Sequence, residues 1–248
     1  MFDTNYYCLV AGLREYSLDG GAKGFDPHAI LDEILRELTP RDLRAVRLLY
    51  GYYDCKNLIA LRAGSPAHDP LGNFARERLK EETEHPRLLP HAIGLVLAAY
   101  ARPDGEEAEE VDTSRPFEQA LFEAYYGLCA ASPSRFLREW SDFDRTLRNV
   151  AAASDFGLRG ELPYIDAVIA AVNDESNLLE KEHKIDRIRW QQAVDLAAED
   201  YFNVNAVLSY LVRINLVARW TQLDEARGRA MLGRLLRELD GKELINNK

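Results

Sequence analysis

Residues 26–50, DPHAILDEILRELTPRDLRAVRLLY, contain two helix starts in succession. Asp26-Pro27 and Thr39-Pro40 each place a capping side chain before a proline at the first helical position, where the missing N–H of proline costs nothing. Apolar residues then recur at helical spacing, at Ile30, Leu31, Ile34, Leu35 and Leu38 and again at Leu43, Val46, Leu49 and Tyr50. This stretch predicts two amphipathic helices, followed by a third at about 57–62.

Similar periodicity continues toward the C-terminus. It predicts helices at 117–128, after Ser132-Pro133, and at about 163–172, 177–198, 204–219 and 225–239. Residues 204–220 are apolar nearly all round, which is typical of a central buried helix. Only the first ten or so residues look strand-like. We therefore expect an all-α bundle of about nine to twelve helices in two or three related helical units, with at most a short N-terminal strand.

An acidic segment interrupts this pattern. Residues 104–112 contain six acidic residues and no basic one, and Pro103 and Pro116 flank them. Such a run is typical of a solvated linker. It predicts an N-terminal unit over 1–102, an acidic linker or loop at 103–115 and C-terminal helical units over 116–248. An exposed loop inside a single domain fits the same run equally well.

The charge balance narrows the possible partners. The chain of 248 residues has 41 acidic and 31 basic residues, a net charge of −10 at pH 7. This disfavours a nucleic-acid binder or a polybasic membrane anchor. No apolar run approaches the length of about 20 residues that spans a bilayer, and the three cysteines are far apart, as expected for free thiols in a reducing cytosol. We expect a cytoplasmic protein without a cofactor.

One weak internal repeat is visible. Tyr52–Ile59 is similar to Tyr201–Leu208, since each has two aromatic residues, a short polar residue and a later aliphatic pair. Asp142-Phe143-Asp144 is a fainter third instance. The pattern indicates a helix start, with Asp54, Asn203 or Asp144 as the capping residue.

No complete catalytic or metal-binding motif is present, because the sequence has no phosphate-binding loop, nucleophile elbow or zinc-ligand pair. The richest polar cluster is Glu182, Asp186 and Arg189, which fall on one helical face. It favours an ion-pair lattice between helices, with Arg189 bridging the two acids. A metal or acid–base site is the alternative. Farther on, Arg219 is expected to pair with a carboxylate or stack on an aromatic ring, and Asp224 to cap the last helix.

Five motifs follow one another along the chain: Tyr6-Tyr7-x-Leu9-Val10-Ala11-Gly12-Leu13, Tyr53-Asp54-x-x-Asn57-Leu58, Leu147-Arg148-Asn149, Glu182-x-x-x-Asp186-x-x-Arg189-Trp190 and Arg219-Trp220-x-x-Leu223-Asp224. Over nearly the whole chain they resemble an uncharacterised bacterial family whose members are encoded among the subunits of V/A-type ATPases. The segment Tyr53–Ala63 also resembles a repeated motif of the rotor adaptor of those V-type ATPases, which is named C in bacteria and d in eukaryotes. That adaptor is an all-α funnel of three similar helical units between the membrane rotor ring and the central stalk.

The resemblance implies a non-catalytic adaptor of an ion-translocating ATPase. Its partners would be central-stalk and rotor-ring subunits, and it would be peripheral to the membrane only through that complex. The candidate structural or interaction residues are Tyr53, Asp54, Asn57, Arg62, Arg148, Asn149, Glu182, Asp186, Arg189, Trp190, Arg219, Trp220 and Asp224. Two departures stand out: the chain is shorter than the rotor adaptor, and it has Asn203 and Ala206 where the first repeat has Asp54 and Asn57.

Two other interpretations remain. A stand-alone helical scaffold or regulator would bind other proteins outside any ATPase. An enzyme would use the Glu182, Asp186 and Arg189 cluster around a divalent metal ion.

Overall fold

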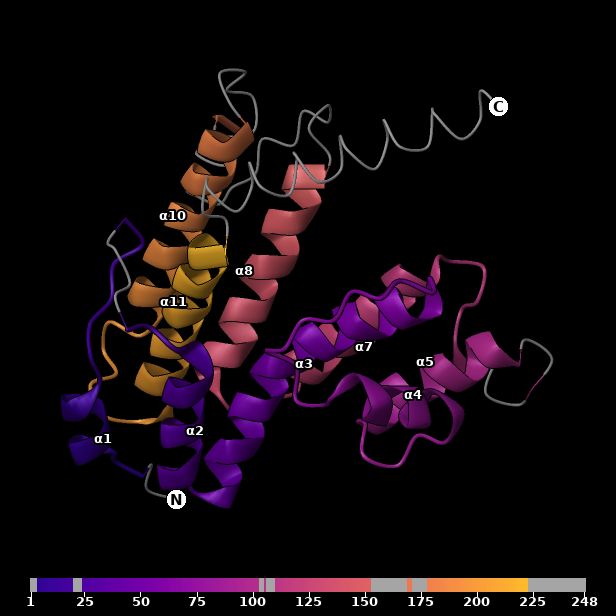
Figure 1. Ribbon diagram of the computed structural model, residues 1–248, viewed down its shortest axis with the longest axis horizontal. Coiled ribbons are helices and arrows are strands. Elements are labelled where there is room, and N and C mark those ends of the chain that lie inside the picture. Colours follow the sequence, from indigo (N-terminus) through magenta and orange to yellow (C-terminus); the bar gives the residue numbers. More distant parts are fainter. Residues whose placement is uncertain are drawn as a thin grey trace, which may run out of the picture.

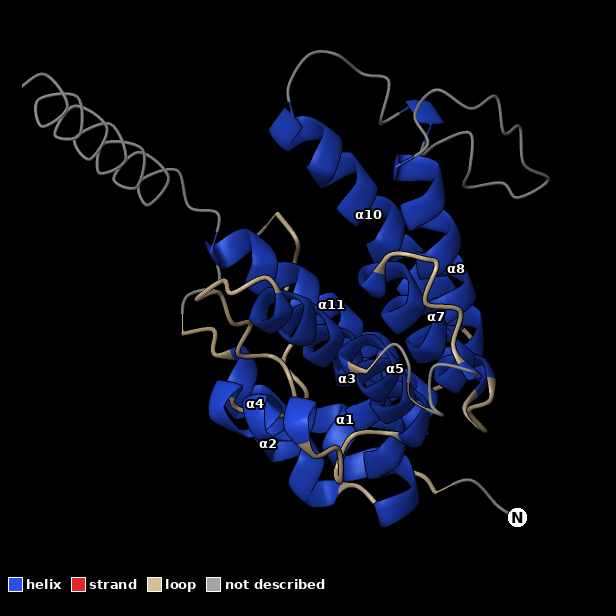
Figure 2. Cartoon of the chain, turned by 90° about the vertical axis from the view of Figure 1, so that its right-hand side faces the viewer, coloured by secondary structure: helices blue, strands red, loops and turns tan. Residues whose placement is uncertain are grey.

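The computed structural model describes residues 4–19, 24–102, 105, 110–152, 169–170 and 178–222. Across these ranges the chain forms nine helices and no strand (Figure 2). The helices are α1 (Tyr7–Gly12), α2 (Pro27–Glu37), α3 (Pro40–Arg62), α4 (Arg76–Glu84), α5 (His91–Ala101), α7 (Phe117–Ala130), α8 (Arg135–Ala152), α10 (Leu178–Leu196) and α11 (Val204–Gln222). The predicted all-α fold is confirmed.

Both helix starts in the 26–50 stretch form as expected. The Asp26 carboxylate accepts the backbone N–H groups of His28 and Ala29 at 3.0 and 3.1 Å. The Thr39 hydroxyl accepts the Asp42 N–H at 3.3 Å. These bonds satisfy N–H groups that have no partner within the helix, so α2 and α3 begin at their prolines.

The helix α3 runs through the middle of the molecule and belongs to two hydrophobic cores (Figure 1). Near its start, Val46 and Tyr50 join the core formed with α2, α8, α10 and α11. Farther along, Cys55 and Leu58 join the core formed with α4, α5 and α7. Each core combines residues from both sides of the acidic segment. The division at 103–115 stays a prediction, and most of residues 103–109 lie outside the described ranges.

The predicted central helix is α11. Its Val207, Leu208 and Leu211 are completely buried, which confirms the expectation from its apolar composition. The predicted helix at 225–239 and most of the one at 163–172 lie outside the described residues. None of the helices in the described ranges is long and apolar enough to cross a membrane.

The start of the chain was predicted wrongly. Residues 7–12 form the helix α1 and not a strand. A single strand needs a neighbour to pair with, and the described ranges offer none. The backbone before α1 is held instead by a hydrogen bond from the Tyr6 N–H to the Phe202 carbonyl at 2.5 Å.

The predicted break before residue 57 was also wrong, because Asp54 and Asn57 lie inside the single helix α3. Asp54 therefore caps no helix, and Asp144 likewise lies inside α8. Buried side chains flank Asp54 on both sides, at Tyr50 and Leu58, so the packing holds the helix continuous. Among the three expected caps, only Asn203 acts as one: it accepts the N–H groups of Asn205 and Ala206 at the start of α11.

Candidate functional site: a polar cavity between five helices

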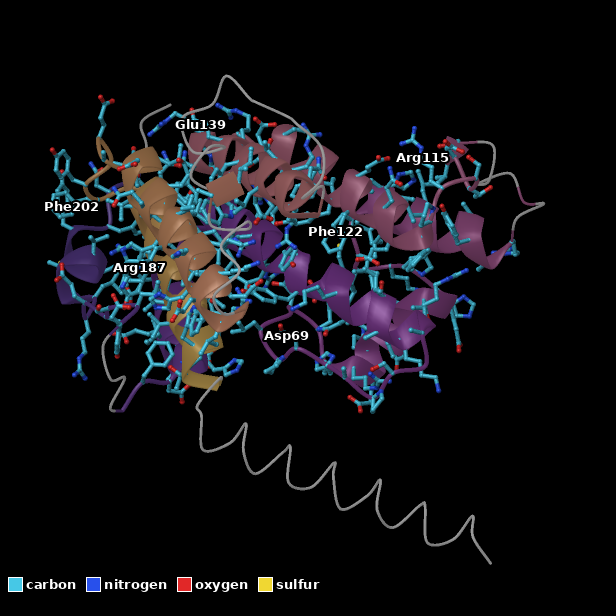
Figure 3. The ribbon with its side chains drawn as sticks, turned by 90° about the horizontal axis from the view of Figure 1, so that it is seen from above. Asp69, Arg115, Phe122, Glu139, Arg187 and Phe202 are labelled. Atoms are coloured by element: carbon cyan, nitrogen blue, oxygen red, sulfur yellow. The ribbon has the colours of Figure 1, made fainter. Side chains whose placement is uncertain are left out.

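A cavity of about 480 Å³ lies where α3, α7, α8, α10 and α11 meet, and we call it the central cavity. The loop after α3 closes one side with Asp69, which Figure 3 labels beside that helix. The fold brings six of the predicted site residues to the cavity wall: Tyr53, Arg148, Glu182, Asp186, Arg189 and Arg219. Residues from four of the five motifs that carry the resemblance therefore line one space.

Asp186 is the centre of the charged wall and is completely buried. Its Oδ1 accepts a hydrogen bond from Arg189 Nη1 at 2.7 Å. Its Oδ2 accepts one from Arg219 Nη1 at 2.7 Å and one from Trp220 Nε1 at 2.8 Å. A buried carboxylate with three donors, two of them cationic, keeps its charge compensated and ties α10 to α11.

The arginine that bridges the two acids is Arg219, whereas Arg189 was predicted for that role. Arg219 contacts both Asp186 and Glu182. Arg189 contacts Asp186 but has no bond to Glu182 among the described contacts; its Nε lies 3.8 Å from Asp144 instead. The helical face was correct, but a partner from another helix decides which guanidinium reaches which carboxylate. The expectation that Arg219 pairs with a carboxylate is confirmed.

A second charged centre forms around Asp144 on α8. The carboxylate accepts hydrogen bonds from Tyr126 Oη at 2.9 Å and from Arg148 Nε at 2.8 Å. The Arg148 guanidinium also lies over the Tyr52 ring, 4.5 Å from its centroid. None of Asp144, Tyr126 and Tyr52 was predicted as a site residue from the sequence. The spacing of Asp144 and Arg148, four residues apart on one helix, was the available signal.

The surroundings fix the protonation states in this cavity. Burial and the neighbouring Asp144 carboxylate raise the pKa of Tyr126, and burial raises the pKa of Tyr53 well above its ordinary value. Burial opposes the charge of Arg148, yet the Asp144 carboxylate raises the pKa of Arg148 above that of a free guanidinium. The phenols are therefore neutral and the arginine cationic at neutral pH.

The charged wall does not fit a metal ion. Both oxygens of Asp186 are bonded to arginine or tryptophan donors, and Glu182 is bonded to Arg219. In the part of the chain that the structure describes, no group of three or more His, Cys, Asp or Glu side chains is placed to hold one. The geometry gives ion pairs between helices, as the favoured sequence interpretation expected.

Asp54 and Asn57 do not belong to this charged wall and hold the loop at 69–74. Asn57 exchanges two hydrogen bonds with the backbone of Asp69, at 2.7 and 2.9 Å. Asp54 accepts from Asn73 Nδ2 at 2.6 Å and from the Phe74 N–H at 3.3 Å. Gly72 lies so close that a Cβ there would be 2.8 Å from both side chains. This motif is a loop anchor.

The remaining predicted residues are dispersed. Arg62 donates to the Tyr100 carbonyl at 3.3 Å and lies 4.6 Å from the Phe117 ring centroid. Trp190 packs against Arg213, whose guanidinium is 5.5 Å from a ring centroid of the indole. Asn149 is exposed on α8. Asp224 and its predicted cap lie outside the described residues.

Comparison with known proteins gives one match. Residues 3–154 and 151–242 match the model of a family described as "Protein of unknown function (DUF2764)". Neither a curated protein nor a solved structure matches the chain. Because the two matched segments together cover far more than half of the sequence, the chain belongs to this family.

Proposed function

We propose that the chain is a non-catalytic part of a V/A-type ion-translocating ATPase, an adaptor similar to the C or d rotor adaptor between the central stalk and the membrane rotor ring. The observation that carries the proposal is the order of the five sequence motifs, with the adaptor-like segment Tyr53–Ala63 among them. Most of that segment lies in the second half of α3, the helix that both cores share.

The packing supports a mechanical role. Asp186, Arg189 and Arg219 connect α10 and α11, and the Asp144 centre connects α7, α8 and α10. Such cross-links between helices resist relative sliding, because moving one helix would leave a buried charge without its partner. A part that transmits torque needs this resistance. The charged groups of the central cavity thus have a structural use that requires no chemical reaction.

The proposal predicts direct binding. The purified chain, titrated separately with purified central-stalk subunits and with detergent-solubilised rotor ring, should bind at least one of them at micromolar concentration. A helical protein of equal net charge serves as the control, because the charge of −10 alone could attract a basic surface. Binding that the control matches, or no binding to either assembly, would contradict the proposal.

The alternative, a stand-alone protein-binding scaffold, has support from an exposed aromatic surface. Tyr7 and Tyr201 are 57 % and 72 % exposed, and the ring of Phe202 lies 4.6 Å from the Tyr7 ring. Aromatic side chains are enriched in the energetically dominant parts of protein interfaces. Replacement of Tyr7 and Tyr201 by Ala, with exposed Leu88 replaced as the control, would show whether this surface binds ATPase subunits or an unrelated protein.

A further inference from the structure

The rim of the central cavity presents cations, while most of the carboxylates that balance them lie behind. The side chains of Arg148 and Arg219 are 37 % and 40 % exposed, whereas those of Asp144 and Asp186 are 11 % and 0 % exposed. Lys56 is likewise more exposed than its partner Asp69. Glu182 matches the arginines in exposure, and Arg219 holds it. In a chain of net charge −10, an approaching solute meets guanidinium groups here.

These guanidinium groups have donors to spare. Arg148 donates its Nε–H to Asp144, and Arg189 donates from Nη1 to Asp186. A guanidinium has five N–H donors in a planar fork that suits the two oxygens of a carboxylate or phosphate. An oxyanion could therefore bind the terminal nitrogens of Arg148 while the ion pairs to Asp144 and Asp186 stay intact.

Another part of the lining is apolar and aromatic. Leu71, Tyr53 and Trp140 contribute to it, and the Tyr52 ring already carries the Arg148 guanidinium on its face. A cavity of about 480 Å³ lies within the range of small-molecule sites. Flat apolar side chains beside a cationic fork suit a molecule with a planar body and one anionic end.

We propose that the central cavity binds a small organic anion, a molecule with a planar apolar body and an oxyanion head group held by Arg148 and Arg219. This site goes beyond the adaptor role and does not depend on it, because any partner protein could be absent while the small molecule binds. The carboxylate and phosphate head groups share this recognition chemistry, and the test separates them.

The test titrates the full-length protein calorimetrically with three matched probes: 2-naphthoate, 2-naphthyl phosphate and the neutral 2-naphthalenemethanol. At least one anion should bind saturably and about tenfold or more tighter than the neutral alcohol, because only the anions can use the guanidinium donors. The anion that binds more tightly identifies the head group. Equal binding of the alcohol, or no saturable binding of either anion, overturns the proposal.

The variant Arg148→Gln should weaken the preferred anion about tenfold while leaving the alcohol unchanged. Its matched control is Arg145→Gln, on the same helix: Arg145 is exposed, pairs with Asp142 at 3.1 Å and does not line the cavity. If Arg148→Gln does not fold, Arg148→Lys replaces it, since Lys keeps the charge beside Asp144 but lacks the fork. Unchanged anion binding in the folded variant, or an equal loss in the Arg145 control, contradicts the assignment.

Discussion

Arg219 on α11 donates to Asp186 on α10 over 2.7 Å, and Asp186 is completely excluded from solvent. The next residue, Trp220, donates to the same carboxylate oxygen at 2.8 Å. Two consecutive residues of one helix thus hold a buried charge on its neighbour. Because a buried charge without partners is costly, the position of α10 against α11 depends on this contact.

Replacement of Asp186 by Ala should therefore destabilise the fold by about 3 kcal/mol, because it leaves Arg189 and Arg219 without their shared buried partner. Urea denaturation measures the loss. The control is Asp142→Ala on α8, an exposed residue paired at the surface with Arg145, which should change stability by less than about 1 kcal/mol. Equal effects of the two substitutions would show that the Asp186 network does not stabilise the fold.

Gly72 should not tolerate even a methyl group. A Cβ there would be 2.8 Å from Asn57 Nδ2 and Asp54 Oδ1, so Gly72→Ala must displace the loop anchor and cost about 1–3 kcal/mol. Gly127, exposed on α7 with no atom within 4 Å of an added Cβ, is the control. Gly127→Ala should stabilise the helix by about 0.5–1 kcal/mol. Thermal unfolding of both variants would refute this account if the two shifts had the same sign.

Stability should depend on pH through Asp54. Burial raises the pKa of this carboxyl from 3.8 to about 6, so the folded state binds its proton more tightly than the unfolded chain does. The contribution of Asp54 to stability is therefore largest below about pH 4 and is lost as pH rises through about 6, by at most about 3 kcal/mol.

The comparison that isolates this effect is wild type against Asp54→Asn, with the free energy of unfolding measured between about pH 4.5 and pH 7.5. The stability of the wild type relative to Asp54→Asn should fall as the pH rises. Parallel pH profiles for the two proteins would mean that Asp54 titrates normally in the folded state.

Glu82 should anchor the loop that precedes α5. Its carboxylate is buried and accepts the backbone N–H groups of Arg87, Leu88 and Leu89 at 2.7, 2.8 and 3.2 Å. The variant Glu82→Gln removes the charge from these bonds and should cost about 1–2 kcal/mol, with faster amide hydrogen exchange at residues 87–89. Its neighbour Glu81 is exposed, so Glu81→Gln should leave that exchange unchanged.

The elements with strong local signals were predictable from the sequence. The paired start signals of α2 and α3 and the apolar composition of α11 each state their outcome without tertiary information. The helix α4 gave no such signal, because Leu79 is the only apolar residue among its nine. Its place is set by the contact of Leu79 with the second core, which no local pattern reveals.

The site was predictable only in part, for a similar reason. Helical periodicity placed Glu182, Asp186 and Arg189 on one face, and the structure keeps them at one cavity wall. Which arginine bridges the acids depends on how α11 lies against α10, a relation between distant segments. The bond from Tyr126 to Asp144 joins α7 to α8 and belongs to the same class of contact.

The central claim, that the chain is an adaptor in a V/A-type ATPase, is tested most directly by purifying the tagged protein from its native cells in mild detergent and identifying what accompanies it by mass spectrometry. The account predicts that catalytic, central-stalk and rotor-ring subunits are recovered together with it. Recovery of the protein without them, from cells shown to contain that ATPase, would contradict the claim.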